Sequence, residues 1–270
     1  MRKLLLKWEQ SHIFSLRALR WIFPLFGVLG LGYWLASTPL QHPAQHPALQ
    51  QLPPHMLWAW ERREDLRWLP ANVGVAYVAT SIELEGSNVR TVPRATALQL
   101  RSDTVAVPVV HVDASWRNPP VLHAAQQAAV VSQVLAAAAR HGAQGQPRVV
   151  QLDFEVRQSQ RAFLRAVVQD IRRQLPADTA LSMTALASWC TGDYWLHDLP
   201  ADEIVPMAFR MGRDDARLRT QLTQDGGFTR PRCQSALGTA TDEPAVLAHV
   251  PRRYHFSPTA WTQQQWQRTQ

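Results

Sequence analysis

The chain has 270 residues, of which 46% are hydrophobic and 18% charged. This composition is typical of a globular protein and excludes disorder of the whole chain. The net charge of +7 is concentrated in the first twenty residues, and beyond them arginines are interspersed with acids, so nucleic-acid binding is not expected. Lysine occurs only at Lys3 and Lys7, which removes Schiff-base and phosphate-loop lysine chemistry from the folded part.

The amino terminus has the pattern of an export signal. A basic segment at 1–20 precedes an uncharged apolar run of about sixteen residues, WIFPLFGVLGLGYWLA, which is just short of the ~17 to 25 residues of a membrane-spanning helix. The positive charges before this run predict that the amino terminus is cytoplasmic and that the rest lies outside. Because the residues around Ala36 make a poor cleavage site, we predict an inner-membrane anchor at 21–38 that holds the protein in the periplasm. A secreted or periplasmic protein is the alternative if the signal is cleaved.

The segments that flank the folded region are expected to be extended. Residues 39–55 are rich in Pro, Gln and His and predict a linker, and residues 262–270 are predicted to be a carboxyl-terminal tail. A flexible linker does not supply the rigid geometry that a metal site needs, so its histidines are not expected to bind a metal ion.

Between these segments, at 56–261, short apolar runs alternate with longer segments. Helices are predicted at 121–141 and 158–175, where apolar residues recur at helical spacing. Alternation of apolar strands with helices favours a parallel sheet covered on both faces, and eight strands favour a small (β/α)8 TIM-type barrel. Some of its helices are expected to be short or missing, chiefly in the last two units, and a doubly wound open sheet is the alternative fold. The strands are predicted at 56–60, 73–79, 105–112, 149–154, 180–187, 204–209, 235–238 and 253–256.

The fourth predicted strand, in the segment VVQLDFEVR, carries the sharpest functional pattern. Because side chains alternate along a strand, Gln151, Asp153 and Glu155 point the same way, into the mouth of the barrel. Two acids so close cannot both ionise freely, so one is expected to keep its proton while the other remains a carboxylate. Cleavage of a glycosidic bond needs this division of roles. The alternative is that the acids cap the following helix or pair with Arg157 and Arg161.

Other polar and aromatic side chains are predicted at the same ends of the strands. The tryptophans are candidate platforms for sugar rings, with core packing as the alternative, and Arg210 is a candidate donor to a substrate. A mechanism with two carboxylates needs a second acid near Glu155. Histidine and aspartate in VVHVD resemble part of a metal site, but they lack a third ligand, so neither a metal nor a cofactor is expected. The candidate substrate-binding residues are Trp58, Trp60, Glu61, His111, Asp113, Trp189, Asp193 and Arg210, and the candidate second acids are Asp113, Asp193 and Glu61.

Several longer segments carry a family resemblance. The stretches LSMTALASWCTGDYWL, VPMAFRMG, TDEP and RRYHFSP resemble the domain-of-unknown-function family 3142, a group of uncharacterised exported bacterial proteins. The resemblance covers about 56–261 and implies a relative of the (β/α)-barrel glycoside hydrolases.

A weaker similarity connects the fourth strand to the chitinase-like glycoside hydrolases, which have the motif D-x-x-D-x-D-x-E. The resemblance implies that Glu155 is the general acid and that Asp153 orients the substrate. Gln151 and Arg148 stand where that motif has its other two acids, so hydrolysis assisted by a substrate acetamido group is in doubt. Arg210 likewise follows Met-Ala-Phe where that family has Tyr-Asp.

These patterns predict a membrane-tethered barrel that acts on an envelope or extracellular polysaccharide, with Glu155 as the proton donor and Asp153 as an orienting carboxylate. The alternative is a non-catalytic carbohydrate-binding or envelope scaffold protein on a degenerate hydrolase barrel.

The two cysteines pose a geometric question. An oxidising periplasm favours a disulfide between Cys190 and Cys233. In an ideal barrel, however, one follows the fifth strand and the other precedes the seventh. Five-residue strands separate those ends by ~16 Å, beyond the reach of a disulfide. The irregular segment 226–232 offers the alternative, because it could carry Cys233 toward the mouth.

Overall fold

The structure is a computed structural model that describes residues 45–142, 144–192 and 195–270. The predicted basic segment and membrane anchor at 1–38 lie outside these ranges, as does Asp193. Within the described ranges, no helix is long and apolar enough to cross a bilayer.

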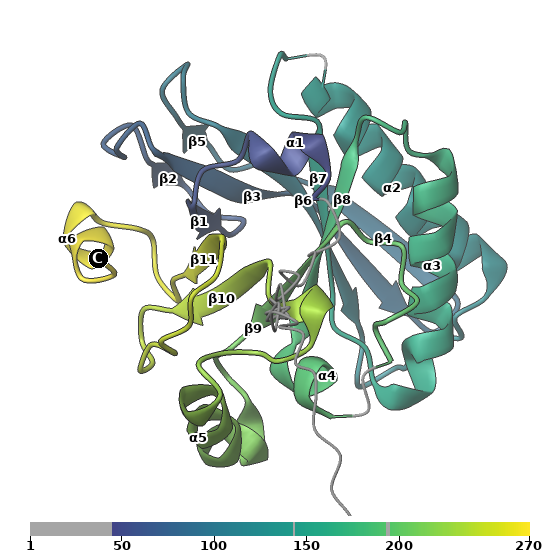
Figure 1. Ribbon diagram of the computed structural model, residues 1–270. Coiled ribbons are helices and arrows are strands. Elements are labelled where there is room, and N and C mark those ends of the chain that lie inside the picture. Colours follow the sequence, from purple (N-terminus) through teal and green to yellow (C-terminus); the bar gives the residue numbers. More distant parts are fainter. Residues whose placement is uncertain (1–44, 143, 193–194) are drawn as a thin grey trace, which may run out of the picture. The chain divides into compact units, whose positions relative to one another are not determined.

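Eight parallel strands form a closed barrel, which confirms the predicted architecture (Figure 1). The first strand pairs with both the second and the last, so the ring has no open edge. The open doubly wound sheet is therefore wrong. All eight predicted strands are present, with boundaries that shift by a few residues and with one much longer strand. They are β1 (His55–Ala59), β3 (Val73–Glu85), β6 (Ala106–Ala114), β7 (Val149–Phe154), β8 (Ala180–Leu186), β9 (Glu203–Met207), β10 (Ala236–Ala240) and β11 (Arg252–Phe256).

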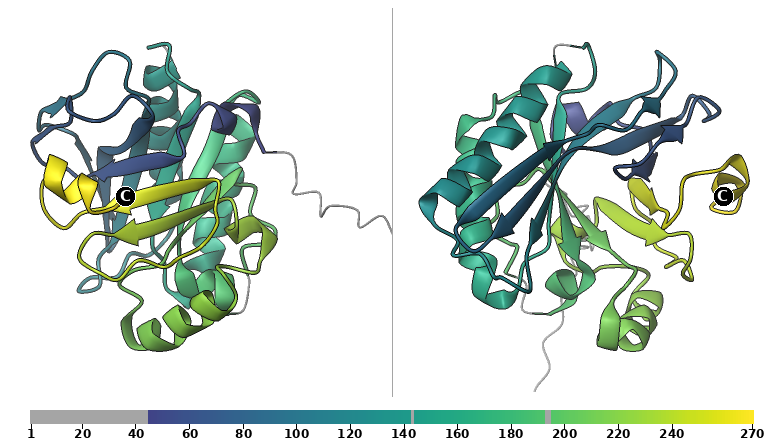
Figure 2. Two further views of the ribbon diagram at one scale, coloured as in Figure 1. Left: turned by 60° about the vertical axis from the view of Figure 1, so that its left-hand side comes forward. Right: turned by 180° about the vertical axis from the view of Figure 1, so that it is seen from behind.

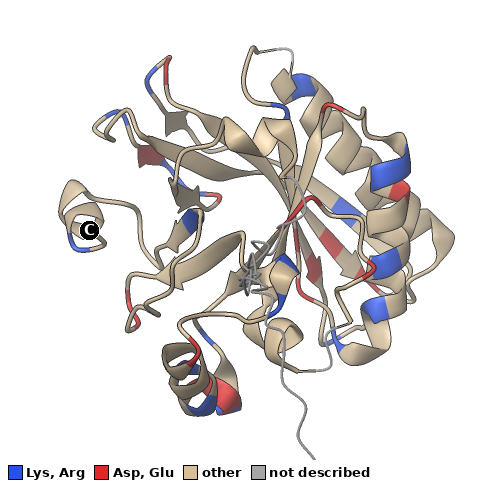
Figure 3. Cartoon of the chain, viewed as in Figure 1, with Lys and Arg blue, Asp and Glu red and all other residues tan. Residues whose placement is uncertain are grey.

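Helices cover mainly one side of the barrel. Helices α2 (Ala124–Gly142) and α3 (Arg161–Gln174) lie beside each other there, with the short α4 (Ala187–Thr191) and α5 (Asp215–Gln224) nearby (Figures 1 and 2). Arginines lie along the outward surface of the helices, whereas acidic residues occur on the strands beneath them (Figure 3). The apolar positions of α3 that the sequence placed on one helical face are all buried against the sheet: Phe163, Leu164, Val167, Val168 and Ile171.

The opposite side of the barrel is closed without long helices. The connection from β10 to β11 is irregular, as expected for the last units. Trp261 and Trp266 pack on the outer face of β1 and β3, together with the small sheet of β2 (Glu64–Asp65) and β5 (Leu98–Gln99). Trp266 belongs to α6 (Gln263–Gln267), so the predicted tail at 262–270 is in part a folded element of the barrel wall.

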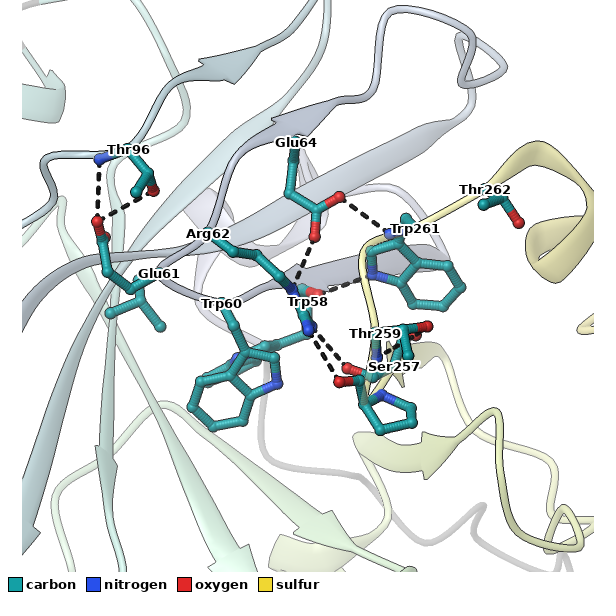
Figure 4. A network of polar contacts seen from close by, with 12 residues as sticks. Trp58, Trp60, Glu61, Arg62, Glu64, Thr96, Ser257, Thr259, Trp261 and Thr262 are labelled. Atoms are coloured by element: carbon teal, nitrogen blue, oxygen red, sulfur yellow. Dashed lines mark hydrogen bonds and ion pairs between the residues drawn. The ribbon is translucent and has the colours of Figure 1, made fainter.

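The buried carboxylate of Glu64 holds this carboxyl-terminal segment against the barrel through hydrogen bonds (Figure 4). Glu64 accepts hydrogen bonds from Arg62 Nε at 3.0 Å and from the backbone N–H of Trp261 at 2.9 Å. Arg62 also donates to the carbonyl oxygens of Ser257 and Pro258. Burial raises the pKa of Glu64, and the bonds from Trp261 and Arg62 offset part of that rise.

The predicted linker at 39–55 is also partly folded. Residues Pro47–Gln50 form helix α1, where Pro47 stands in the first turn and the His46 ring accepts the backbone N–H of Ala48 at 3.2 Å. Leu49 and Leu52 are buried at the amino-terminal end of the strands, among the side chains that fill the inside of the barrel, here called the inner core. The side chains packed between the strands and the helices are called the outer core. This helix could not be predicted from the sequence because its few apolar residues stand among Pro, Gln and His.

Beneath the mouth, the barrel interior holds a buried polar network. Glu203 accepts hydrogen bonds from Ser182 Oγ at 2.7 Å and from Tyr254 OH at 2.9 Å, and it forms an ion pair with Arg252. Gln151 donates to Ser182 Oγ at 2.8 Å. Burial, reinforced by Glu203, raises the pKa of Tyr254, so its hydroxyl remains a donor.

The longest strand contains a bulge that the sequence did not reveal. Pairing of β3 with β6 shifts between Val78 and Thr80, which reverses the side-chain alternation and turns Ile82 toward the helices. Beyond the bulge, β3 continues to Glu85 and pairs antiparallel with β4 (Asn88–Pro93). Gly86 turns the hairpin at φ +53°, a conformation that favours glycine.

The two cysteines form a disulfide with a Cα–Cα distance of 6.1 Å. The expectation that Cys190 and Cys233 lie at opposite ends of the barrel, too far apart to bond, is therefore wrong. The strand assignment was sound, because β10 begins at Ala236, one residue after the predicted start. The cysteines come within bonding distance because neither of them lies at the end of a strand. Cys190 lies inside α4, which begins directly after β8, and Cys233 lies in a 3-10 helix that packs near β9. Both side chains belong to the outer core.

Two histidines from the first and last strands stack beneath α6. His55 and His255 lie with ring centroids 5.4 Å apart, and Nδ1 of His55 stands 3.1 Å from Nε2 of His255. Trp266 meets both rings edge-on. Burial, followed by repulsion from His55 and Arg253, lowers the pKa of His255 to about 3, and burial also lowers the pKa of His55.

This pair predicts a loss of stability in acid. Because the pKa of His255 is about 3 in the folded state and its ordinary value is 6.5, the unfolded chain binds more protons between these limits. At pH 4.5 the loss from His255 alone is about 2.5 kcal/mol relative to pH 7. Denaturant unfolding of His255→Phe, which keeps a stacked ring without a titrating group, is expected to show a shallower fall from pH 7 to 4.5. An unchanged slope would contradict this assignment.

Candidate functional site

The register of two neighbouring strands assembles the candidate site. On β6, Val107 and Val109 face the inner core, and His111 and Asp113 continue the same face toward the mouth. On β7, Val150, Leu152 and Phe154 face the helices, so Asp153 faces inward, as predicted, and Glu155 follows directly after the end of the strand. His111 and Asp153 are opposite each other in the β6–β7 pairing. Asp113 and Glu155 each follow two residues later, at the carboxyl ends of the strands.

Asp153 is held by two side chains from neighbouring strands. Its Oδ2 is 2.7 Å from His111 Nδ1, and its Oδ1 accepts a hydrogen bond from Thr184 Oγ1 at 2.6 Å. The residue is only 5% exposed. Thr184 did not enter the sequence prediction, although the inward positions of LSMTAL alternate Ser182 and Thr184, a polar signal unusual for a buried strand.

Glu155 lies exposed at the rim above this pair. Desolvation by the surrounding protein raises its pKa, Asp153 and Asp113 add repulsion, and His111 partly opposes them. The direction and the leading cause are those expected for a proton donor in a shared mouth. The sequence also predicts that an acid in a shared mouth is at least partly buried; the exposure of Glu155 differs from that prediction and, taken alone, favours the helix-capping alternative.

The helix-capping alternative does not describe Asp153, whose two oxygens bond to His111 and Thr184. The chain enters the helical segment after β7 through Arg157, whose backbone N–H donates to Gln160 Oε1 at 2.9 Å. The backbone N–H at the start of this helical segment is therefore bonded by Gln160, a residue of the segment itself, and not by Asp153.

Of the three candidate sugar platforms, the structure places only Trp60 partly open at the mouth. Its ring meets the His111 ring edge-on, with centroids 5.5 Å apart. Trp58 is fully buried and stacks on Phe256 at 4.6 Å. Trp189 is 2% exposed and packs on Trp195 in the outer core, because α4 begins at once after β8 and turns it away from the mouth. Neither Trp58 nor Trp189 offers an open ring face, which corrects the prediction for both.

Two other predicted residues are engaged by neighbouring loops. Glu61 Oε1 accepts hydrogen bonds from the backbone N–H groups of Ala95 and Thr96, each at 3.0 Å. Desolvation alone would raise the pKa of Glu61, but these bonds outweigh it and lower the pKa. Glu61 therefore anchors a loop, which makes it a poor second acid.

Arg210 adopts a positive φ of 51°, and the Glu243 carboxylate accepts its backbone N–H at 3.0 Å. Its side chain is 61% exposed, and its guanidinium lies 3.6 Å from the Asp242 carboxylate. The side chain is thus accessible after β9, as a substrate donor needs to be.

In the described part of the chain, no three His, Cys, Asp or Glu side chains are grouped so that they could hold a metal ion. Two buried polar atoms of the barrel interior, Trp58 Nε1 and Gln151 Oε1, have no hydrogen-bond partner among the described residues. Buried groups of this kind are ordinarily satisfied by ordered water.

The fold and the site together define a small TIM-type barrel with ionisable side chains at the carboxyl ends of β6 and β7. No family model and no curated protein matches the chain, so the resemblance to the domain-of-unknown-function family 3142 is not confirmed. Among solved structures, the chain is similar to the spore cortex-lytic enzyme SleL of Bacillus cereus, with a TM-score of 0.45 and 16% sequence identity. The similarity covers 69% of this chain and 51% of that enzyme, so the chain spans about half of its length.

Proposed function

We propose that the protein is a glycoside hydrolase-like enzyme that acts on an envelope or extracellular polysaccharide, with Glu155 as the proton donor. The observation that carries the proposal is the surroundings of Glu155, which is accessible to a substrate and has two further acids beside it. A carboxyl group with a raised pKa keeps its proton closer to neutral pH and can give it to a glycosidic oxygen.

The charge of the mouth fits the same reaction. Asp113, Asp153 and Glu155 outnumber His111 around the point where the strands end, and the transition state of glycoside cleavage resembles a positively charged oxocarbenium ion. Carboxylates already fixed in place stabilise such a charge without reorganising.

Asp113 is the best candidate for the second carboxylate. It follows the β6–β7 pairing on the strand next to Glu155, and neighbouring strands lie about 4.8 Å apart. Repulsion from Asp113 also contributes to the raised pKa of Glu155, which supports this choice.

An exported location supports a polysaccharide substrate. The disulfide between Cys190 and Cys233 suits an oxidising compartment. The inner-membrane anchor at 21–38 and the periplasmic location remain predictions from the sequence.

Replacing Glu155 by glutamine tests the function. We expect turnover in a panel of envelope glycans to fall about 10²- to 10⁴-fold, because the amide cannot donate the proton, while glycan binding persists. The assay uses the full-length chain in a mild detergent and measures the reducing ends released and the glycan retained.

The matched control is Asp225→Asn, which removes one exposed charge at the end of α5 and should leave turnover unchanged. Glycan binding without turnover by the unaltered protein would favour the non-catalytic alternative. Turnover that survives Glu155→Gln would rule out Glu155 as the donor.

A further inference from the structure

The contacts of Asp153 give it a different role from the one its place in the strand suggests. Both of its oxygens accept hydrogen bonds from the protein, one from Thr184 Oγ1 and one from the His111 ring. With 5% exposure, the carboxylate is turned toward these partners and has little surface for a substrate.

His111, in contrast, is fixed and still accessible. Its side chain is 32% exposed, and Asp153 occupies its Nδ1. Trp60 stands nearly perpendicular to the ring, at 87°, and restricts its rotation. Within the described residues, Nε2 makes no hydrogen bond, and a ring bonded through Nδ1 carries Nε2 on the side away from Asp153.

The groups that face His111 favour its protonated form. They are Asp113 on its own strand, Asp153 on β7, Glu155 directly after β7, and the uncharged Ser81, which is opposite His111 in the register of β3. Desolvation lowers the pKa of His111, but the hydrogen bond and charge of Asp153, with help from Asp113 and Glu155, outweigh it and raise the pKa. In the protonated form the ring keeps Nδ1–H on Asp153 and presents Nε2–H as a donor.

We propose that His111 is the residue that binds a hydroxyl oxygen of the sugar beside the scissile bond, by donating a hydrogen bond from Nε2, and that Asp153 is a positioning residue that acts through it. This inference rests on the proposed function and adds a preference in the substrate. Because the Asp113 carboxylate lies beside His111 on the same face of β6, an acidic sugar at this position meets a like charge. The favoured substrate is therefore a glycan whose sugar at this position is uncharged and rich in hydroxyl groups.

Kinetics of three variants test the donor role. His111→Phe keeps a planar ring without nitrogen and is expected to lower kcat/KM about 10- to 100-fold, the worth of a hydrogen bond from a charged group. His111→Gln keeps an N–H donor and is expected to recover part of the loss. Asp153→Asn should cause a loss similar to that of His111→Phe. The control His123→Phe changes a histidine whose ring contacts the Ser87 carbonyl oxygen of the hairpin turn and accepts the backbone N–H of Gln126, and it should keep full activity.

NMR titration of the histidine rings supplies a reading that does not depend on turnover. The His111 signal, assigned by its loss in His111→Phe, is expected to titrate above free imidazole and to move to lower pH in Asp153→Asn. Addition of a neutral oligosaccharide should shift the Nε2 resonance, and a polymer of uronic acid should shift it less.

These results separate the inference from the proposed function. If no glycan is cleaved but the neutral sugar shifts Nε2, the hydrolase proposal fails while the donor role stands. A titration unchanged in Asp153→Asn would overturn the positioning role of Asp153. Full activity of His111→Phe, or an Nε2 resonance that no sugar shifts, would overturn the donor role of His111.

Discussion

Replacing Arg252 by methionine is expected to lower the free energy of unfolding by about 3 to 5 kcal/mol. Arg252 and Glu203 form an ion pair inside the barrel, where the two side chains are 4% and 0% exposed. Without the guanidinium, the donors left to the Glu203 carboxylate among the described residues are the hydroxyl groups of Ser182 and Tyr254. Arg252 also donates to the carbonyl oxygen of Leu49, so the variant should loosen α1 as well.

Denaturant unfolding measures this loss. The control is the double variant Glu203→Gln with Arg252→Met, in which no buried charge is left without a partner, and it should be more stable than the single variant. A single variant within about 1 kcal/mol of the unaltered protein would show that water or a rearranged side chain compensates the charge.

Removal of the disulfide is the second large effect. The bond joins residues 43 apart, and in the chain-entropy model a loop of that length contributes about 4 kcal/mol. We expect the Cys190→Ala, Cys233→Ala double variant to lose about that much, with a further cost for the cavity that the sulfur atoms leave in the outer core.

Reduction separates the two contributions, because it breaks the bond and keeps the sulfur atoms. Both cysteines are almost fully buried, so the reductant has to be added to the unfolded chain before refolding. Reductant should destabilise the unaltered protein and leave the alanine variant unchanged. Equal stability of the oxidised and reduced proteins would mean that the bridge does not constrain the unfolded chain.

The barrel could be predicted because buried parallel strands leave a strong local signal. The run Val149–Phe154 is apolar enough to be assigned to the residue. Elements that are stabilised by distant contacts have a weaker local signal in the sequence. Helix α1 depends on burial of Leu49, and α6 depends on Trp266 packing against β1 and β3. Neither segment is apolar enough to predict its fold alone.

For the candidate site, alternation along a strand predicted which side chains share a face but not what each one contacts. It placed Asp153 and Glu155 on the inner face, yet the partners of Asp153 come from β6 and β8, whose register the sequence does not reveal. Alternation also ends where a strand ends. Trp189 stands three residues beyond β8, and the immediate start of α4 turned it into the outer core.

The pairing of β1 with β11 has a consequence for the order in which the molecule forms. These neighbours are separated by about 200 residues, since His55 bonds to His255. While the chain is being synthesised, the sheet can grow from β3 to β10 but keeps two unpaired edges until the last strand arrives. Exposed edges recruit other strands, and distant pairings form slowly. We therefore expect the emerging chain to need protection from aggregation until β11 is available to pair with β1.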